Sequence, residues 1–366
     1  MSRVRVLLVQ LGSHGDCLFS TIVARQIKEF DYPGAYLAWL IGDKYKNAII
    51  NNPDIDEIIE LPLNGNLQEK RDNIEEIIKN MGLDYDQVFI TDFYKPNYNK
   101  FYGTTRSAIL RCYPHKIKTK IEARIFLTEN EKDNVKRFCS KNKINSDSFN
   151  ILIEAMPQSA QSSMNIQKAL LLAEHMVKIN PRVKCIISSP QKLPESDLYV
   201  DASVLSYREN AELANYCDLL LGCSSGISWL CLSNWTKPLN MVQIINPNYA
   251  NGNFSASVKH DLMYHGITTA NIIELYNPAE KVIIECLRII LCKSFIDAQK
   301  KYDKDNFYTF TNKMFLAEAK LRYVYKIKMW KIYAWQYIGV LRDYVRLRTR
   351  IKKLFSFCGL SLDGKK

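Results

Sequence analysis

The segment Arg3-Val-Arg-Val-Leu-Leu-Val-Gln-Leu-Gly-Ser-His-Gly-Asp16 decides the fold class of this chain. Its apolar run at residues 4–9 is typical of a strand that is buried on both faces of a parallel sheet. Gly12 and Gly15 allow a sharp turn and a close approach of the backbone to a ligand. Because α/β sheets bind ligands beyond the carboxyl ends of their strands, Asp16 is predicted to lie at the mouth of a site.

The composition predicts a two-domain protein that folds in a reducing compartment. A length of 366 residues is long for a single core. The first apolar run has only the length of a strand, and no apolar stretch reaches the ~18 residues of a membrane span, so we expect neither a signal peptide nor a spanning helix. Ten cysteines are present without a Cys-x-x-Cys pair or zinc spacing, which favours reduced core cysteines and a cytoplasmic location.

Strand and helix patterns alternate through residues 1–147, which predicts an N-terminal domain with a parallel, doubly wound sheet. A polar, tyrosine-rich segment at residues 92–103 is predicted to be a long loop at the carboxyl edge of that sheet. Strands are expected at residues 4–9, 36–41, 58–61 and 87–91, and helices at residues 17–30, 67–80 and, as a short one, up to residue 50.

The alternation restarts after the polar stretch at residues 141–148, which predicts a second Rossmann-like domain at residues 148–300. The two halves are expected to face each other across a cleft. Strands are expected at residues 150–153, 183–188, 218–221 and 239–244, and helices at residues 165–179, 206–216 and 278–299.

The glycine loop is not the dinucleotide-binding fingerprint, because it lacks the pattern Gly-x-Gly-x-x-Gly. The region after the second strand offers only Asp43, in a weak pattern, as an acid for the ribose. An NAD enzyme is therefore disfavoured, and we expect no cofactor. Two interpretations of Asp16 stay open from spacing alone: a carboxylate that caps the next helix, or a functional acid at the sheet edge.

A second candidate site is the segment Gly222-Cys-Ser-Ser-Gly-Ile-Ser-Trp229, where a buried strand ends in a Gly/Ser loop that opens a helix. Free N–H groups and the positive end of the helix dipole suit a phosphate there, and Ser224 and Ser225 add hydroxyl donors. The alternative is an ordinary Ser N-cap. An acid on one half and a phosphate cradle on the other suit group transfer from a phosphate-activated donor.

The residues carry a resemblance to a known family. The opening segment, Tyr32-Pro-Gly-Ala, Trp39-Leu-Ile-Gly42 and Asn52-Pro-Asp-Ile-Asp56 resemble, in the same order, the N-terminal half of the bacterial heptosyltransferases. These are GT-B glycosyltransferases of family 9 that build lipopolysaccharide core. A looser likeness covers residues 206–238, and the resemblance as a whole spans roughly residues 3–245.

The resemblance implies an inverting, metal-independent transfer in which Asp16 is the catalytic base. Asp16 would take the proton of an acceptor hydroxyl that attacks a nucleotide-diphosphate sugar, with ADP-heptose as the first donor to try. The departing diphosphate would gather charge at the helix start formed by Ser224, Ser225 and Gly226. Gly12, Ser13, His14, Gly15 and Arg106 would form the glycine loop and the acceptor side.

Two departures from the family pattern leave the donor sugar open. Ser224 and Trp229 stand where the family has Asp and His, and residues 157–163 lack the family's Lys, so Gln161 and Ser159 are the candidates to contact the phosphates. The Ser-Ser-Gly-Ile-Ser-Trp form is similar to the branch that glycosylates autotransporter proteins.

His14 could sense or donate charge beside a diphosphate, or only shape the cleft. Arg106 could meet an acidic acceptor, or be a solvated residue at a helix start.

Most of the net charge of +12 lies in a C-terminal tail, residues 301–366, predicted to be helical. Residues 313–353 contain 12 Lys and Arg against two acids, interleaved with Tyr and Trp. Three interpretations compete: a helix packed on the body, a helix on an anionic membrane surface, and a nucleic-acid contact. We expect the proximal part to pack on the body, residues 326–357 to lie on the inner face of a bacterial inner membrane, and no nucleic acid to bind.

The sequence therefore predicts a glycosyltransferase of surface-glycan or lipopolysaccharide assembly with a glycan or lipid-linked acceptor. Three alternatives remain: a transferase of the same fold with another sugar nucleotide or a protein acceptor, a sugar-nucleotide epimerase, and a membrane-associated scaffold with a degenerate donor site.

Overall fold

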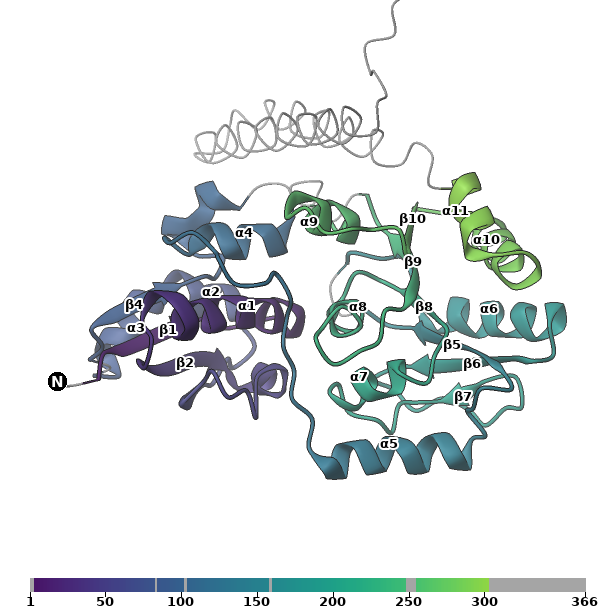
Figure 1. The fold of residues 1–366 in the computed structure, drawn as a ribbon, viewed down its shortest axis with the longest axis horizontal. Helices are drawn as coiled ribbons and strands as arrows, with labels where there is room; N and C mark the ends of the chain where they lie inside the picture. Colours follow the sequence, from purple (N-terminus) through teal and green to yellow (C-terminus); the bar gives the residue numbers. More distant parts are fainter. Residues whose placement is uncertain (1–2, 83, 102–103, 158–159, 248–254, 303–366) are drawn as a thin grey trace, which may run out of the picture.

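The computed structural model describes residues 3–82, 84–101, 104–157, 160–247 and 255–302. Two parallel sheets, each covered by helices, form the body of the molecule (Figure 1). Ser159 and residues 303–366 of the basic tail, including residues 326–357, lie outside the described residues, so the predictions for them stay predictions.

The N-terminal sheet has four parallel strands in the order β3-β2-β1-β4. Leu7 and Val9 of β1 face the core on one side, and Val6 and Leu8 face the core on the other, all with no exposed surface. The prediction from the apolar run at residues 4–9 is confirmed. The strands are β1 (Arg5–Val9), β2 (Tyr36–Gly42), β3 (Glu57–Leu61) and β4 (Gln87–Ile90).

Two helices of this half differ from the expected ones. The helix after the glycine loop begins at His14, three residues before Cys17, and continues after Gln26 as a π-helical turn. The expected helix at residues 67–80 is two helices, because Asn73 between them leaves helical geometry (φ −103°, ψ 14°). The helices are α1 (His14–Gln26), α2 (Leu67–Asp72), α3 (Ile74–Asn80) and α4 (Thr105–Cys112), and the predicted loop at residues 92–103 holds a 3₁₀ turn, Lys95–Lys100.

The C-terminal sheet has six parallel strands in the order β10-β9-β8-β5-β6-β7. The four expected strands are present, and β7 and β10 were not predicted. These strands are β5 (Phe149–Glu154), β6 (Val183–Ser188), β7 (Val200–Asp201), β8 (Leu219–Gly222), β9 (Asn240–Ile245) and β10 (Ile272–Tyr276).

The single helix expected at residues 278–299 is two helices, because Ser294 accepts the N–H of Asp297 and starts a new one. α5 packs against α7 (Figure 1), so it belongs with the C-terminal sheet, while the predicted domain boundary at residues 147–148 stays a prediction. The helices of this half are α5 (Glu129–Lys141), α6 (Ile166–Ile179), α7 (Glu209–Ala214), α8 (Gly226–Leu230), α9 (Val258–Tyr264), α10 (Glu280–Cys292) and α11 (Phe295–Tyr302).

The two halves meet through helices that begin at the carboxyl edges of the sheets. α1 packs against α8, and α4 packs against α9 (Figure 1). The N-terminal half is β1–β4 with α1–α4, and the C-terminal half is β5–β10 with α5–α11.

The nine cysteines of the described residues are unpaired, and eight of them are buried, as predicted. Within the same residues, every helix is too short or too polar to cross a membrane.

Candidate functional site

The carboxylate of Asp16 has two different surroundings. Its Oδ2 accepts the backbone N–H of Ser13 at 2.9 Å and the Ser13 hydroxyl at 3.0 Å, so this oxygen caps the start of α1. Among the residues that the structure describes, its Oδ1 has no hydrogen-bond partner, and this oxygen lies 3.5 Å from Nη1 of Arg106. The capping interpretation therefore describes one oxygen, while the other faces the Arg106 guanidinium.

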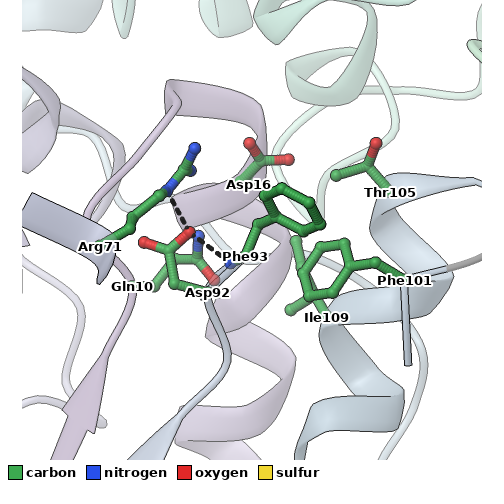
Figure 2. Close-up of a pocket in the computed structure, with 8 residues that line it drawn as sticks. All are labelled: Gln10, Asp16, Arg71, Asp92, Phe93, Phe101, Thr105 and Ile109. Atoms are coloured by element: carbon green, nitrogen blue, oxygen red, sulfur yellow. Dashed lines mark hydrogen bonds and ion pairs between the residues drawn. The ribbon is translucent and has the colours of Figure 1, made fainter. Parts of the chain in front are cut away.

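A cavity of about 120 Å³ opens beside Asp16 at the carboxyl ends of β1 and β4. The cavity combines aromatic rings with a cation and two carboxylates, the mixture that orients small polar ligands. Figure 2 shows the side chains that line it: Gln10, Asp16, Arg71, Asp92, Phe93, Phe101, Thr105 and Ile109.

Arg71 and Asp92 hold the glycine loop in place. Asp92 accepts the N–H of Leu11 at 2.7 Å and lies 2.6 Å from Nε of Arg71 (Figure 2), and Arg71 also donates to the carbonyl of Gly12. Burial raises the pKa of Asp92, and the Arg71 guanidinium opposes that rise. Sequence analysis missed both as site residues, although Asp92 directly follows a predicted strand.

Both glycines of the loop have side chains packed closely against them. A Cβ at Gly12 would overlap the Tyr45 ring, and a Cβ at Gly15 would lie 2.5 Å from Nη2 of Arg106. Because these neighbours are close-packed against the loop, the glycines serve the packing of the site as well as its turn.

His14 lies between two tyrosine rings. The centroid of its ring is 4.5 Å from that of Tyr207 and 5.0 Å from that of Tyr45. Burial lowers the pKa of His14, so the imidazole is neutral at pH 7. These contacts fit a side chain that shapes the junction between the two halves.

Arg106 is buried, which overturns the alternative of a solvated residue at a helix start. Its guanidinium lies over the Trp229 ring, 5.3 Å from the centroid. Arg106 does not line the cavity; the arginine that lines it is Arg71. The predicted acceptor contact of Arg106 therefore stays a prediction, and its observed neighbours are Asp16 and Trp229.

The loop at residues 222–229 has the predicted strand–loop–helix geometry, with Ser225 as the N-cap of α8. Ser224 adopts a left-handed backbone (φ 54°), and its N–H donates to Oε1 of Gln243 at 2.8 Å. The N–H of Cys223 donates to Glu154 at 3.0 Å. In this described loop, the N–H groups at the start of α8 are the ones that lack partners within the helix and can face a ligand.

Gln161 supports this loop by donating to the carbonyl of Ser224 at 3.1 Å. Its Oε1 is buried and has no hydrogen-bond partner within the described residues. Gln161 therefore lies next to the loop, as expected, and its contact with a phosphate stays a prediction.

Trp229 brings the two loops together. It is buried, with its ring centroid 5.3 Å from that of Phe19 in α1. A Cβ at Gly226 would lie 3.5 Å from Cβ of His14. The glycine loop and the loop at residues 222–229 are thus in contact across the two halves.

Arg208 is a further contact between the halves that sequence analysis missed. It lies in a capping box, where Ser206 and Glu209 exchange hydrogen bonds. Its Nη1 donates to the carbonyls of Asn47 and Ile50 in the N-terminal half at 3.3 Å and 3.2 Å.

Glu154 is a buried carboxylate under the loop at residues 222–229. Burial raises its pKa to about 7, while the N–H of Cys223 and the hydroxyl of Ser228 lower it. The folded protein therefore holds the proton of the Glu154 carboxyl more tightly than the unfolded chain, in which the pKa of this group has its ordinary value of 4.5. The stability that this group contributes is present below pH 4.5 and is lost as the pH rises to about 7.

Glu154→Gln is expected to remove this pH dependence because the amide does not titrate. Relative to the wild type, the variant should gain roughly 2–3 kcal/mol in unfolding free energy between pH 5 and pH 8. Urea unfolding at both pH values measures the difference. The exposed Glu195→Gln is the control and should follow the wild type. The same change of unfolding free energy between pH 5 and pH 8 in Glu154→Gln and the wild type would contradict the burial argument.

No protein-family model matches the chain, and no curated protein matches it either. Solved structures do match. A family 9 glycosyl transferase from Veillonella parvula has a TM-score of 0.54 and 16% identity over 78% of this chain and 92% of that one. The ADP-heptose lipopolysaccharide heptosyltransferase II of E. coli has a TM-score of 0.51 and 12% identity over 79% of this chain and 99% of that one.

The chain has the GT-B fold. The fold that the resemblance to the heptosyltransferase-like family implied is thereby confirmed. In the same described residues, no group of three His, Cys, Asp or Glu side chains is arranged to hold a metal ion.

Proposed function

We propose that this protein is an inverting, metal-independent glycosyltransferase that uses Asp16 as its base. The observation that carries the proposal is Oδ1 of Asp16, which accepts no hydrogen bond from the described part of the chain. Asp16 lines a cavity, and its loop contacts the loop at residues 222–229 of the other half. The carboxylate of Asp16 in one half and the start of α8 in the other half can then act on the same donor and acceptor. The GT-B fold supports the same class of reaction.

In the proposed step, an acceptor hydroxyl in the cavity attacks the anomeric carbon of a nucleotide-diphosphate sugar. Oδ1 of Asp16 takes the hydroxyl proton as the new C–O bond forms. The bond from the anomeric carbon to the phosphate oxygen breaks, and the diphosphate leaves with the electron pair. Its negative charge is stabilised by the N–H groups at the start of α8, where Ser225 and Gly226 lie.

The acceptor is proposed to be a glycan or a lipid-linked sugar of surface-glycan or lipopolysaccharide type. The rings of Phe93 and Phe101 offer apolar surface to a sugar ring, and Gln10 and Thr105 offer hydrogen bonds to its hydroxyls. A protein acceptor is the alternative.

ADP-heptose is the first donor to test. Thermal unfolding of the wild type in ADP-, UDP-, GDP- and CMP-sugars is expected to show a rise in midpoint with one nucleotide class only, since binding to the folded state alone stabilises it. At 100 times the dissociation constant, the stabilisation is about 2.7 kcal/mol. A shift with another class would redirect the donor assignment without affecting the reaction type.

A catalytically degenerate scaffold is the second candidate, and one observation favours it. The N–H groups of Cys223 and Ser224 already bind Glu154 and Gln243, so the loop offers fewer donors to a phosphate. An unchanged unfolding midpoint with every sugar nucleotide of the panel would favour the scaffold. An epimerase would need a second acid on the opposite wall of the site. Asp92 does not meet this need, because it comes from the same half as Asp16 and its oxygens are already bonded.

We also propose that residues 326–357 bind the inner face of a bacterial inner membrane. Basic and aromatic residues alternate there, and each Lys or Arg near an anionic surface contributes about 1 kcal/mol. Deletion of residues 326–366 is expected to abolish sedimentation with anionic vesicles and to leave binding to neutral vesicles unchanged. Undiminished sedimentation of the truncated chain with anionic vesicles would refute the membrane role.

A further inference from the structure

The first turn of α4 is capped by a carboxylate from the opposite half. Oδ1 of Asp261 in α9 accepts the N–H of Ser107 at 2.8 Å and the Ser107 hydroxyl at 2.6 Å, and it also accepts the hydroxyl of Thr104. The N–H groups of a first helical turn have no partners inside the helix. The start of α4 in the N-terminal half therefore depends on a side chain of the C-terminal half.

The same turn carries Arg106. Its guanidinium is enclosed by the Trp229 ring and by the backbone at Gly15, and it reaches to 3.5 Å from Oδ1 of Asp16. Arg106 follows the N-cap residue of α4 by two positions. A shift of this helix start would therefore move the guanidinium relative to Asp16.

The helix that carries Asp261 is itself anchored. Glu274 of β10 accepts the Ser257 hydroxyl at 2.8 Å and the N–H of Lys259 at 2.9 Å, which fixes the start of α9 to the C-terminal sheet. A backbone bridge between Thr104 and Ser255 runs beside the Asp261 contacts. A series of contacts therefore runs from β10 to the helix that carries Asp261, and from Asp261 to the turn of α4 that places Arg106 beside Asp16.

We propose that Asp261 is a positioning residue that seats Arg106 beside Asp16 only when the two halves are in contact. Asp261 does not line the cavity and acts through α4. Separation of the halves would remove the cap, release the first turn of α4 and withdraw the guanidinium from Asp16. The kinetic consequence rests on the proposed function, whereas the structural coupling does not.

Hydrogen exchange tests the coupling without any substrate. Asp261→Ala in the full chain is expected to speed exchange about fivefold or more in peptides that cover residues 104–112, and also in peptides that cover residues 13–19. Asp201→Ala is the matched control. Asp201 accepts two N–H groups and one hydroxyl, from Leu193 and Ser203, entirely within the C-terminal half, so its loss should leave both peptides unchanged.

Asp261→Asn retains an acceptor for the N–H of Ser107 and should restore most of the protection, and it serves if the alanine variant does not fold. Faster exchange at residues 104–112 without a change at residues 13–19 would overturn the proposal.

A double-mutant cycle, measured by steady-state kinetics, is the second test of the proposal. Asp261→Ala is expected to lower kcat about tenfold with little change in KM for the donor, and to have less than a twofold effect in an Arg106→Ala background. Losses that multiply in the double variant would show that Asp261 does not act through Arg106. If no donor supports transfer, the proposed function fails, and the exchange result still decides the coupling.

Discussion

Asp16→Asn is expected to reduce sugar transfer by roughly 10²–10⁴-fold, because the amide cannot take the acceptor proton. The fold should be kept, since the carbonyl oxygen of asparagine can still accept the N–H of Ser13 that Oδ2 accepts now. Single-turnover measurement of nucleotide release, with acceptor present, gives the rate of the chemical step. Donor binding should change little, because Asp16 lies in the opposite half from the loop at residues 222–229, to which we assign the phosphates of the donor in the proposed step.

The matched control is Asp201→Asn, which replaces a carboxylate that also caps backbone N–H groups but lies away from the cavity. Its turnover should equal that of the wild type. Near wild-type turnover in Asp16→Asn would refute the assignment of the base, and equal losses in both variants would indicate damage to the fold.

Trp229→Ala is expected to cost about 3–5 kcal/mol in unfolding free energy, because it empties a fully enclosed site between α1, α4 and α8. The variant also removes the surface on which the Arg106 guanidinium lies. Urea unfolding followed by circular dichroism measures the loss. Trp229 Nε1 has no hydrogen-bond partner in the described residues, so Trp229→Phe gives up volume alone and should cost much less.

Trp235→Ala is the control in the same half. Trp235 is only half-buried, so its removal leaves a smaller cavity and should cost less than the loss of Trp229. A loss below about 1 kcal/mol for Trp229→Ala would contradict the view that this side chain joins the two halves.

The two sheets and the two loops could be predicted because their evidence is local. The apolar run at residues 4–9, the glycines at 12 and 15 and the strand–loop–helix pattern at residues 222–229 are each visible within a few positions. β7 has two residues, too few to show a period, and the break after α10 depends on one serine cap.

The side chains that complete the site could not be predicted, because their partners are distant in sequence. Arg71 and Asp92 meet Gly12 and Leu11 across 59 and 81 positions. Asp261 caps α4 from 154 positions away. Charged residues at such separations look like ordinary surface groups in the sequence, because only the folded chain brings each one to its partner.

The most direct test of the central claim is hydrogen exchange of the wild-type protein with each nucleotide sugar of the panel. The account predicts that one nucleotide sugar protects residues 222–230 and that addition of acceptor then protects residues 10–16. Protection confined to other segments, or no protection of residues 222–230 by any of these donors, would contradict the claim that the two loops form one site for glycosyl transfer.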